Sequence, residues 1–119
     1  MAVKDKLTEE FLEALKEIES TLFMLSFVKH SFQEKGLAYF FEFKKNNVIL
    51  EFLFGPPEFQ IEMIIYTSKG KFAFRDLLEI KTIWKWVNDN RYVQLNDRSI
   101  KDELNWFVEL MKVSMAEVE

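Results

Sequence analysis

Three alternating runs of apolar and polar residues fill the middle of the chain, at residues 37–67. Side chains alternate between the two faces of a β-strand, so each run places its apolar residues on one face of a sheet. An Asn pair at 46–47 separates the first two runs, and Gly-Pro-Pro at 55–57 separates the second from the third. Asn tolerates the positive φ of a two-residue hairpin loop, and proline lacks the N–H that a central strand needs. The pattern predicts a three-stranded antiparallel meander.

The loop lengths set the register that we expect between these strands. A two-residue loop at 46–47 brings Glu42 opposite Glu51, and a four-residue loop at 55–58 brings Glu51 opposite Glu62. All three strands then share one apolar face, which a slip of one residue would destroy. The residues expected on this core face include Leu37, Phe41, Leu50, Phe52, Ile61 and Met63, with Phe54 opposite Phe59.

A helix is predicted before the meander, because apolar residues recur at alternating steps of four and three after Thr8. Thr8 is the expected N-cap, and the helix is expected to end near Leu25. The apolar stripe lasts barely two heptads, which favours packing on the sheet over a coiled-coil seam. The stripe consists of Phe11, Leu15, Ile18, Leu22 and Leu25.

Residues 20–36 have the weakest pattern, because three apolar residues in 23–27 alternate like a strand where the helical stripe runs out. We keep the helix to near Leu25 and expect a polar connection after it, followed by a turn at Gly36. The single histidine, His30, lies in this connection without a second histidine or a cysteine to share a metal. We therefore expect His30 to be a solvated loop residue.

A turn at 67–70 and a short fourth strand at 71–74 are expected after the meander. A helix is then expected over residues 75–87, ending at the Asn-Asp-Asn sequence of 88–90. Trp86 lies about 100° from the apolar stripe of this helix, so it marks either the edge of the helix interface or an exposed anchor. The stripe consists of Leu77, Ile80, Ile83, Trp84 and Val87.

The last helix is predicted to begin after Ser99, a good N-cap, with Asp102 in the capping-box position. Residues 92–95 are expected to form a brief extended segment before it. Trp106 is expected to lie off the buried stripe of the helix. This stripe consists of Ile100, Leu104, Phe107, Leu110 or Met111, and Val113.

These elements predict one α+β domain over residues 1–119, with an N-terminal helix, a three- to four-stranded antiparallel β-meander and two C-terminal helices packed on one sheet face. The chain has 119 residues, 49% of them apolar, with 13 phenylalanines and no cysteine, so we expect a single core without disulfides. The N-terminus is acidic where a signal peptide would be apolar, and the longest densely apolar stretch, 22–28, is too short to span a bilayer. We expect a soluble cytoplasmic protein.

Charge and motifs narrow the functional classes. A net charge of −4 disfavours nucleic-acid binding, which needs clustered Lys and Arg, and mildly favours a basic protein partner. The chain lacks the phosphate-loop, dinucleotide, nucleophile-elbow and zinc-protease motifs, and its three glycines are scattered. We expect a non-enzymatic protein with no cofactor, metal or membrane partner.

The face opposite the expected core has the most unusual pattern, because the expected register sets Glu42, Glu51 and Glu62 side by side between apolar rows. Like charges directly opposite each other destabilise a sheet. Three interpretations stay open: a solvated sheet face, a site for a cationic partner and a divalent-cation site. The candidate partner-binding residues are Glu42, Glu51, Glu62, Phe40, Ile49, Leu53, Ile64 and Tyr66.

The order of elements, with FRDLLEIKTIWKW at 74–86 and ELNWFVELM at 103–111, resembles the small acidic immunity proteins of bacterial polymorphic and contact-dependent toxin systems. The resemblance spans most of the chain and is architectural and compositional. It implies a cytoplasmic protein that binds a cognate toxin, often a basic nuclease, and blocks it stoichiometrically.

The same order of elements is also similar to small acidic chaperones of specialised secretion. That resemblance implies a dimer that holds an extended effector segment in an apolar groove. An inhibitor of a folded toxin would instead use a compact patch. The acidic row favours the inhibitor.

Overall fold

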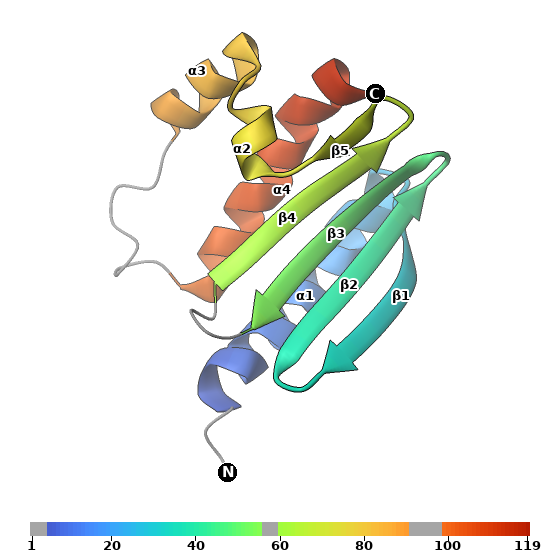
Figure 1. Ribbon diagram of the computed structural model, residues 1–119. Helices are drawn as coiled ribbons and strands as arrows, with labels where there is room; N and C mark the ends of the chain where they lie inside the picture. Colours follow the sequence, from blue (N-terminus) through green and yellow to red (C-terminus); the bar gives the residue numbers. More distant parts are fainter. Residues whose placement is uncertain (1–4, 56–59, 91–98) are drawn as a thin grey trace.

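The computed structural model describes residues 5–55, 60–90 and 99–119. These residues form an α+β fold with a five-stranded antiparallel sheet, one strand more than the largest number expected (Figure 1). No helix among them is long and apolar enough to cross a membrane. The elements are α1 (Asp5–Met24), β1 (Val28–Lys35), β2 (Ala38–Lys45), β3 (Val48–Gly55), β4 (Gln60–Thr67), β5 (Gly70–Phe72), α2 (Phe74–Leu77), α3 (Lys81–Asp89) and α4 (Ile100–Val118).

The sheet is a meander in which neighbouring strands follow the chain order β1-β2-β3-β4-β5. α1 and α4 pack against each other behind the sheet, and α2 and α3 lie beside β5 and α4 (Figure 1). None of the described helices covers the front face of the sheet in this view. The predicted packing of helices on one sheet face is therefore confirmed for α1 and α4, whereas α3 packs mainly on α4.

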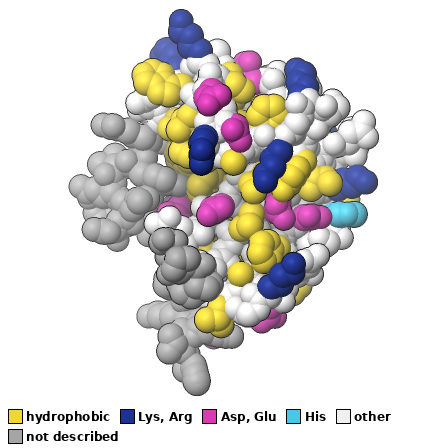
Figure 2. All heavy atoms as spheres, viewed as in Figure 1, with side chains coloured by type: hydrophobic (Ala, Val, Ile, Leu, Met, Phe, Trp, Pro, Cys, Tyr) yellow, Lys and Arg dark blue, Asp and Glu magenta, His cyan; other side chains and the backbone are white. Residues whose placement is uncertain are grey.

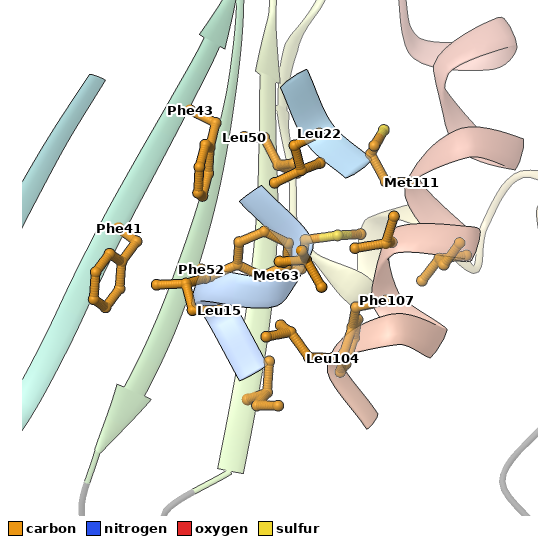
Figure 3. Packing of buried hydrophobic residues seen from close by; sticks show 14 of the residues in the cluster. Leu15, Leu22, Phe41, Phe43, Leu50, Phe52, Met63, Leu104, Phe107 and Met111 are labelled. Carbon is orange, nitrogen blue, oxygen red and sulfur yellow. The ribbon is translucent and has the colours of Figure 1, made fainter. Parts of the chain in front are cut away.

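The core fills the layer between the long helices and the covered face of the sheet (Figure 3). Phe52 of β3 is completely buried in this layer, near Leu15 of α1. The rings of Phe11 and Phe54 stack with their centroids 4.6 Å apart. The first four residues of the predicted α1 stripe are buried, and Leu25 is partly buried at its end. The expected packing of α1 on the sheet is confirmed.

β1 is an edge strand where we expected a polar connection. Seven of its eight residues are exposed, so it lacks the apolar alternation that predicts a strand. Its pairing with β2 shifts between Lys29 and Ser31, and His30 lies at this bulge. His30 is exposed as expected, but it belongs to a strand and not to a loop.

A two-residue turn at Gly36 and Leu37 joins β1 to β2. The φ of 63° at Gly36 confirms the turn predicted there. The expectation that Leu37 faces the core is wrong, because the hairpin closes at the pair of Lys35 and Ala38. Leu37 is 52% exposed.

The hairpin between β2 and β3 has the predicted register. Glu42 faces Glu51, and a two-residue loop at 46–47 joins the strands. Asn46 has a φ of 54°, the positive φ for which an Asn pair is suited.

The hairpin between β3 and β4 is shifted by two residues from the predicted register. We expected Gly55 to begin the loop, but it continues β3 and pairs with β4. A side chain at this position would collide with β2, because a Cβ on Gly55 would lie 2.7 Å from the Cα of Ala38. Phe54 therefore faces Ile61 and not Phe59, which lies outside the described residues. An even shift keeps every side chain on its predicted face.

The helix predicted over 75–87 is divided into α2 and α3 by a bend at 78–80. Leu77 and Ile83 are both completely buried. Residues six apart lie about 120° apart around a continuous helix, so the bend allows both side chains to reach the core. Trp84 is 54% exposed, which contradicts its expected place in the buried stripe.

Trp86 and Trp106 pack together, with ring centroids 5.6 Å apart. Trp86 is partly buried, so it belongs to the edge of the helix interface and is not an exposed anchor. Trp106 is 8% exposed, and its indole N–H donates a hydrogen bond to the carbonyl oxygen of Asn90. The expectation that Trp106 lies off the buried surface is wrong, because α3 packs on that side of α4.

The two predicted N-caps have different outcomes. The Oγ of Ser99 accepts a hydrogen bond of 3.0 Å from the backbone N–H of Asp102, which confirms the start of α4. α1 begins at Asp5, so Thr8 lies inside the helix and is not its N-cap. The predicted α4 stripe is buried except for Val113, which is partly exposed, and residues 92–95 lie outside the described residues.

α1 ends in a Schellman motif that has serine in the usual place of glycine. The backbone N–H of Phe27 donates to the carbonyl oxygen of Leu22, and that of Ser26 donates to Phe23. Ser26 has a φ of 74°, a conformation that is unfavourable for a residue with a Cβ. The motif turns the chain directly from α1 into β1.

We expect Ser26→Gly to raise the free energy of unfolding by about 0.5–1 kcal/mol, because glycine adopts this positive φ without steric cost. Denaturant unfolding of the variant and the wild type measures the difference. Ser20→Gly, an exposed position inside α1, is the matched control and should destabilise the protein slightly. Equal destabilisation by both variants would contradict the role assigned to Ser26.

Candidate functional site

The sheet face opposite the helices, which we call the outer face, carries all eight predicted partner-binding residues. The strand faces are as predicted, because the shift between β3 and β4 is even. The register gives three rows: Phe40, Leu53 and Glu62; Glu42, Glu51 and Ile64; and Lys44, Ile49 and Tyr66.

The predicted row of three glutamates is wrong in one member. Glu42 faces Glu51, as expected, but Ile64 and not Glu62 faces Glu51 on the other side. Glu62 faces Leu53 in the next row and is diagonal to Glu51. The outer face therefore has one pair of directly opposed carboxylates, with a third at a corner.

A neighbouring hydroxyl donates to each of the opposed carboxylates. The Oγ of Ser31 donates to Oε1 of Glu42 over 3.1 Å, and the Tyr66 hydroxyl donates to Oε1 of Glu51 over the same distance. Neither glutamate forms an ion pair with any residue that the structure describes. These two bonds to charged acceptors offset part of the repulsion and hold the carboxylates in place.

The pKa of Tyr66 is raised above its usual value, chiefly because burial disfavours the phenolate. Its hydrogen bond to Glu51 favours the protonated form further, and the negative charges of Glu51 and Glu42 act in the same direction. Tyr66 therefore remains a hydroxyl donor throughout the neutral pH range.

The apolar residues of the outer face are neither buried nor fully exposed. Phe40, Ile49, Leu53 and Ile64 are all partly exposed, since no described helix covers them. Figure 2 shows this face, with hydrophobic and acidic side chains interspersed and several Lys or Arg side chains among them. The ammonium group of Lys35 lies 5.7 Å from the ring centroid of Phe40. Such a mixture suits a protein partner better than an apolar ligand.

Contributions from β1 to this face were missed by sequence reasoning. Ser31 lies opposite Glu42, and Lys35 lies over Phe40. Both belong to a strand with almost no buried residues, so no alternation marked them. The available signal was weak and consisted of one isolated aromatic residue, Phe32, in a polar stretch before Gly36.

The divalent-cation interpretation gains no support from the geometry. Among the described residues, no three His, Asp or Glu side chains are grouped so that they could hold a metal ion. Glu42 and Glu51 each accept a hydroxyl hydrogen bond, and His30 is exposed at the β1 bulge.

We expect Glu51→Gln to lower the pKa of Tyr66 toward its usual value without restoring it fully, because the effect of burial persists. Absorbance titration of the phenolate measures the change, and Tyr66→Phe identifies the signal. Glu62→Gln is the control and should leave this pKa unchanged. An unaltered titration in Glu51→Gln would contradict the assigned contact.

The same coupling predicts how stability depends on pH. Because the folded protein holds the Tyr66 proton more tightly than the unfolded chain does, the stabilisation is complete below about pH 10 and is lost as pH rises through the raised pKa. Glu51→Gln should lose less unfolding free energy than the wild type over this alkaline range. Denaturant unfolding at a series of pH values measures the loss.

Comparison of the chain with protein-family models, with curated proteins and with solved structures found no match.

Proposed function

We propose that this protein is a non-enzymatic inhibitor of the immunity-protein kind, which neutralises a cognate bacterial toxin in the cytoplasm by one-to-one binding through its outer face. The observation that carries the proposal is the opposed pair of Glu42 and Glu51, which lies among apolar residues on a sheet face that no described helix covers.

The opposed carboxylates destabilise the free protein locally, because like charges across a strand pair repel each other. A Lys or Arg side chain of a partner between them would remove this repulsion on binding. The attraction between the partner's cation and the two carboxylates exists only in the complex. It therefore favours binding of a basic partner such as a nuclease domain.

The hydrogen bonds to Ser31 and Tyr66 prepare the pair for such a contact. Each bond uses the Oε1 atom, so Oε2 of each glutamate can still accept a hydrogen bond from a guanidinium or ammonium group. Because the carboxylates are already oriented, less side-chain entropy is lost when the partner binds.

The apolar rows would supply the area that is removed from water. Phe40 and Leu53 lie on one side of the glutamate pair, and Ile49 and Tyr66 lie on the other. An interface with charges at its centre needs such neighbours to exclude solvent around the ion pairs. Binding of this kind blocks a toxin by covering its surface and requires no chemistry from the inhibitor.

The test first examines the neighbouring reading frames for a toxin domain, which the proposal expects there. It then measures binding of that purified domain to wild-type protein and to Glu42→Gln/Glu51→Gln. We expect a one-to-one complex with the wild type and at least about tenfold weaker binding with the variant, equivalent to roughly 1.4 kcal/mol. Calorimetry at low salt gives both the stoichiometry and the affinity.

Glu9→Gln/Glu13→Gln is the matched control, because it removes the same charge from two exposed positions on α1. The control should retain wild-type affinity. The outer-face variant should be at least as stable as the wild type, since the opposed charges are gone. Equal affinity of the two folded double variants would remove the glutamate pair from the mechanism.

A further inference from the structure

β4 is paired along only part of its length on the side that faces β5. β5 is three residues long and pairs with residues 65–67 of β4. Residues 60–64 of β4 have no strand neighbour on that side among the described residues. The sheet therefore has an incomplete edge next to α2 and α4.

A local hydrogen bond accompanies the early end of β5. The backbone N–H of Ala73 donates to Oδ2 of Asp76 over 2.8 Å, and α2 begins at the next residue, Phe74. This cap turns the chain away from the sheet just where β5 would continue along β4.

The open part of β4 presents unpaired backbone groups. Alternate residues of a strand direct their N–H and C=O to opposite sides. The two-residue turn at 68–69 makes Thr67 and Gly70 the hydrogen-bonded pair that closes the β4–β5 hairpin, so Ile65 also directs its backbone groups to β5. By the same alternation, the groups of Met63 and Ile61 are directed to that side. The described residues provide no hydrogen-bond partner there for Ile61 or Met63.

An apolar groove of about 410 Å³ lies along this edge. The rings of Phe74 and Phe107 meet edge-to-face in its wall, with centroids 6.4 Å apart. Charged residues border it, with Glu62 on β4 and Arg75 on α2. The groove is lined by Gln60, Ile61, Glu62, Met63, Ile64, Ala73, Phe74, Arg75, Glu103 and Phe107.

We propose that this groove binds an extended segment of a partner protein, which adds to β4 as an antiparallel strand in line with β5. Backbone donors and acceptors directed to a strand edge select a polypeptide backbone over a small apolar ligand. This interaction uses the open edge of β4 and does not rest on the proposed function of the outer face.

The register predicts the side chains of the bound segment. Residues opposite Ile61 and Met63 point to the groove side of the sheet, where an apolar side chain packs near Phe74 and Phe107. The residue between them points to the outer face opposite Glu62, where a Lys or Arg is complementary. The segment is therefore expected to contain the alternation apolar, basic, apolar.

The experiment uses the full-length ¹⁵N-labelled protein and the blocked peptide acetyl-Thr-Val-Lys-Val-Thr-amide at millimolar concentration. We expect chemical-shift changes in residues 60–64 and at Phe74 and Phe107. The amides of Ile61 and Met63 should exchange with solvent more slowly by about tenfold or more, because the added strand protects them.

The control peptide carries N-methyl groups on its two valines, which removes the donors opposite Ile61 and Met63 without shortening the side chains. It should cause no protection. Equal binding of both peptides would overturn strand addition in favour of simple filling of an apolar groove, and the absence of any shift with the first peptide would overturn the proposal as a whole.

A protein variant tests the charge. Glu62→Lys should reverse the preference, so that acetyl-Thr-Val-Glu-Val-Thr-amide binds better than the lysine peptide. An unchanged preference would contradict the predicted register.

Sedimentation of the free protein tests whether a second copy of the chain occupies the groove. A dimer in which the Ile61 and Met63 amides are already protected would overturn the assignment to a partner segment.

Discussion

The structure depends on burying one face of β2, β3 and β4 beneath α1 and α4. Phe43, Leu50 and Phe52 on this face are at most 1% exposed. Full burial of such a side chain contributes about 1.5–3 kcal/mol relative to exposure. Strand alternation then forces the intervening residues, including Glu42 and Glu51, onto the outer face. The repulsion between those two carboxylates is only some tenths of a kcal/mol, so the core determines their position.

This constraint explains why the faces of the sheet were predictable from sequence while one register was not. The sheet face on which a side chain lies depends on whether its position is odd or even within the strand. A shift by one residue would expose the apolar side chains, so burial disfavours it. A shift by two residues leaves burial unchanged, so the position of the loop decides it. Gly55 resembles a loop residue in sequence, yet it is the last residue of β3, where its close approach to Ala38 leaves no room for a Cβ and so requires glycine. Glu62 therefore lies on the predicted face but not in the predicted row.

Elements with little buried surface could not be predicted from the sequence, because only buried positions leave an apolar pattern. β1 has almost no apolar side chain to bury, and the residue that turns α1 into it is Ser26 and not the glycine that would signal a helix end. Missing β1 also meant missing Ser31, the hydrogen-bond donor to Glu42. The burial of Trp106 was missed because it depends on α3, whose separation from α2 has no proline or glycine to mark it.

The two edges of the sheet differ in a way that bears on both proposals. β1 has a bulge at His30 and exposed lysines near both ends, which are features that discourage pairing with another strand. The open residues of β4 contain no lysine and border an apolar groove. Glu62 lies between Ile61 and Met63 on the open stretch of β4, and its side chain is on the outer face. A partner bound on the outer face and a segment bound at the edge would therefore both lie close to its charge. The proposed inhibitor of a folded toxin would bind through Glu42 and Glu51, whereas a chaperone that holds an extended segment would bind through the β4 edge. Whichever of these two surfaces governs partner affinity therefore distinguishes the two functional classes.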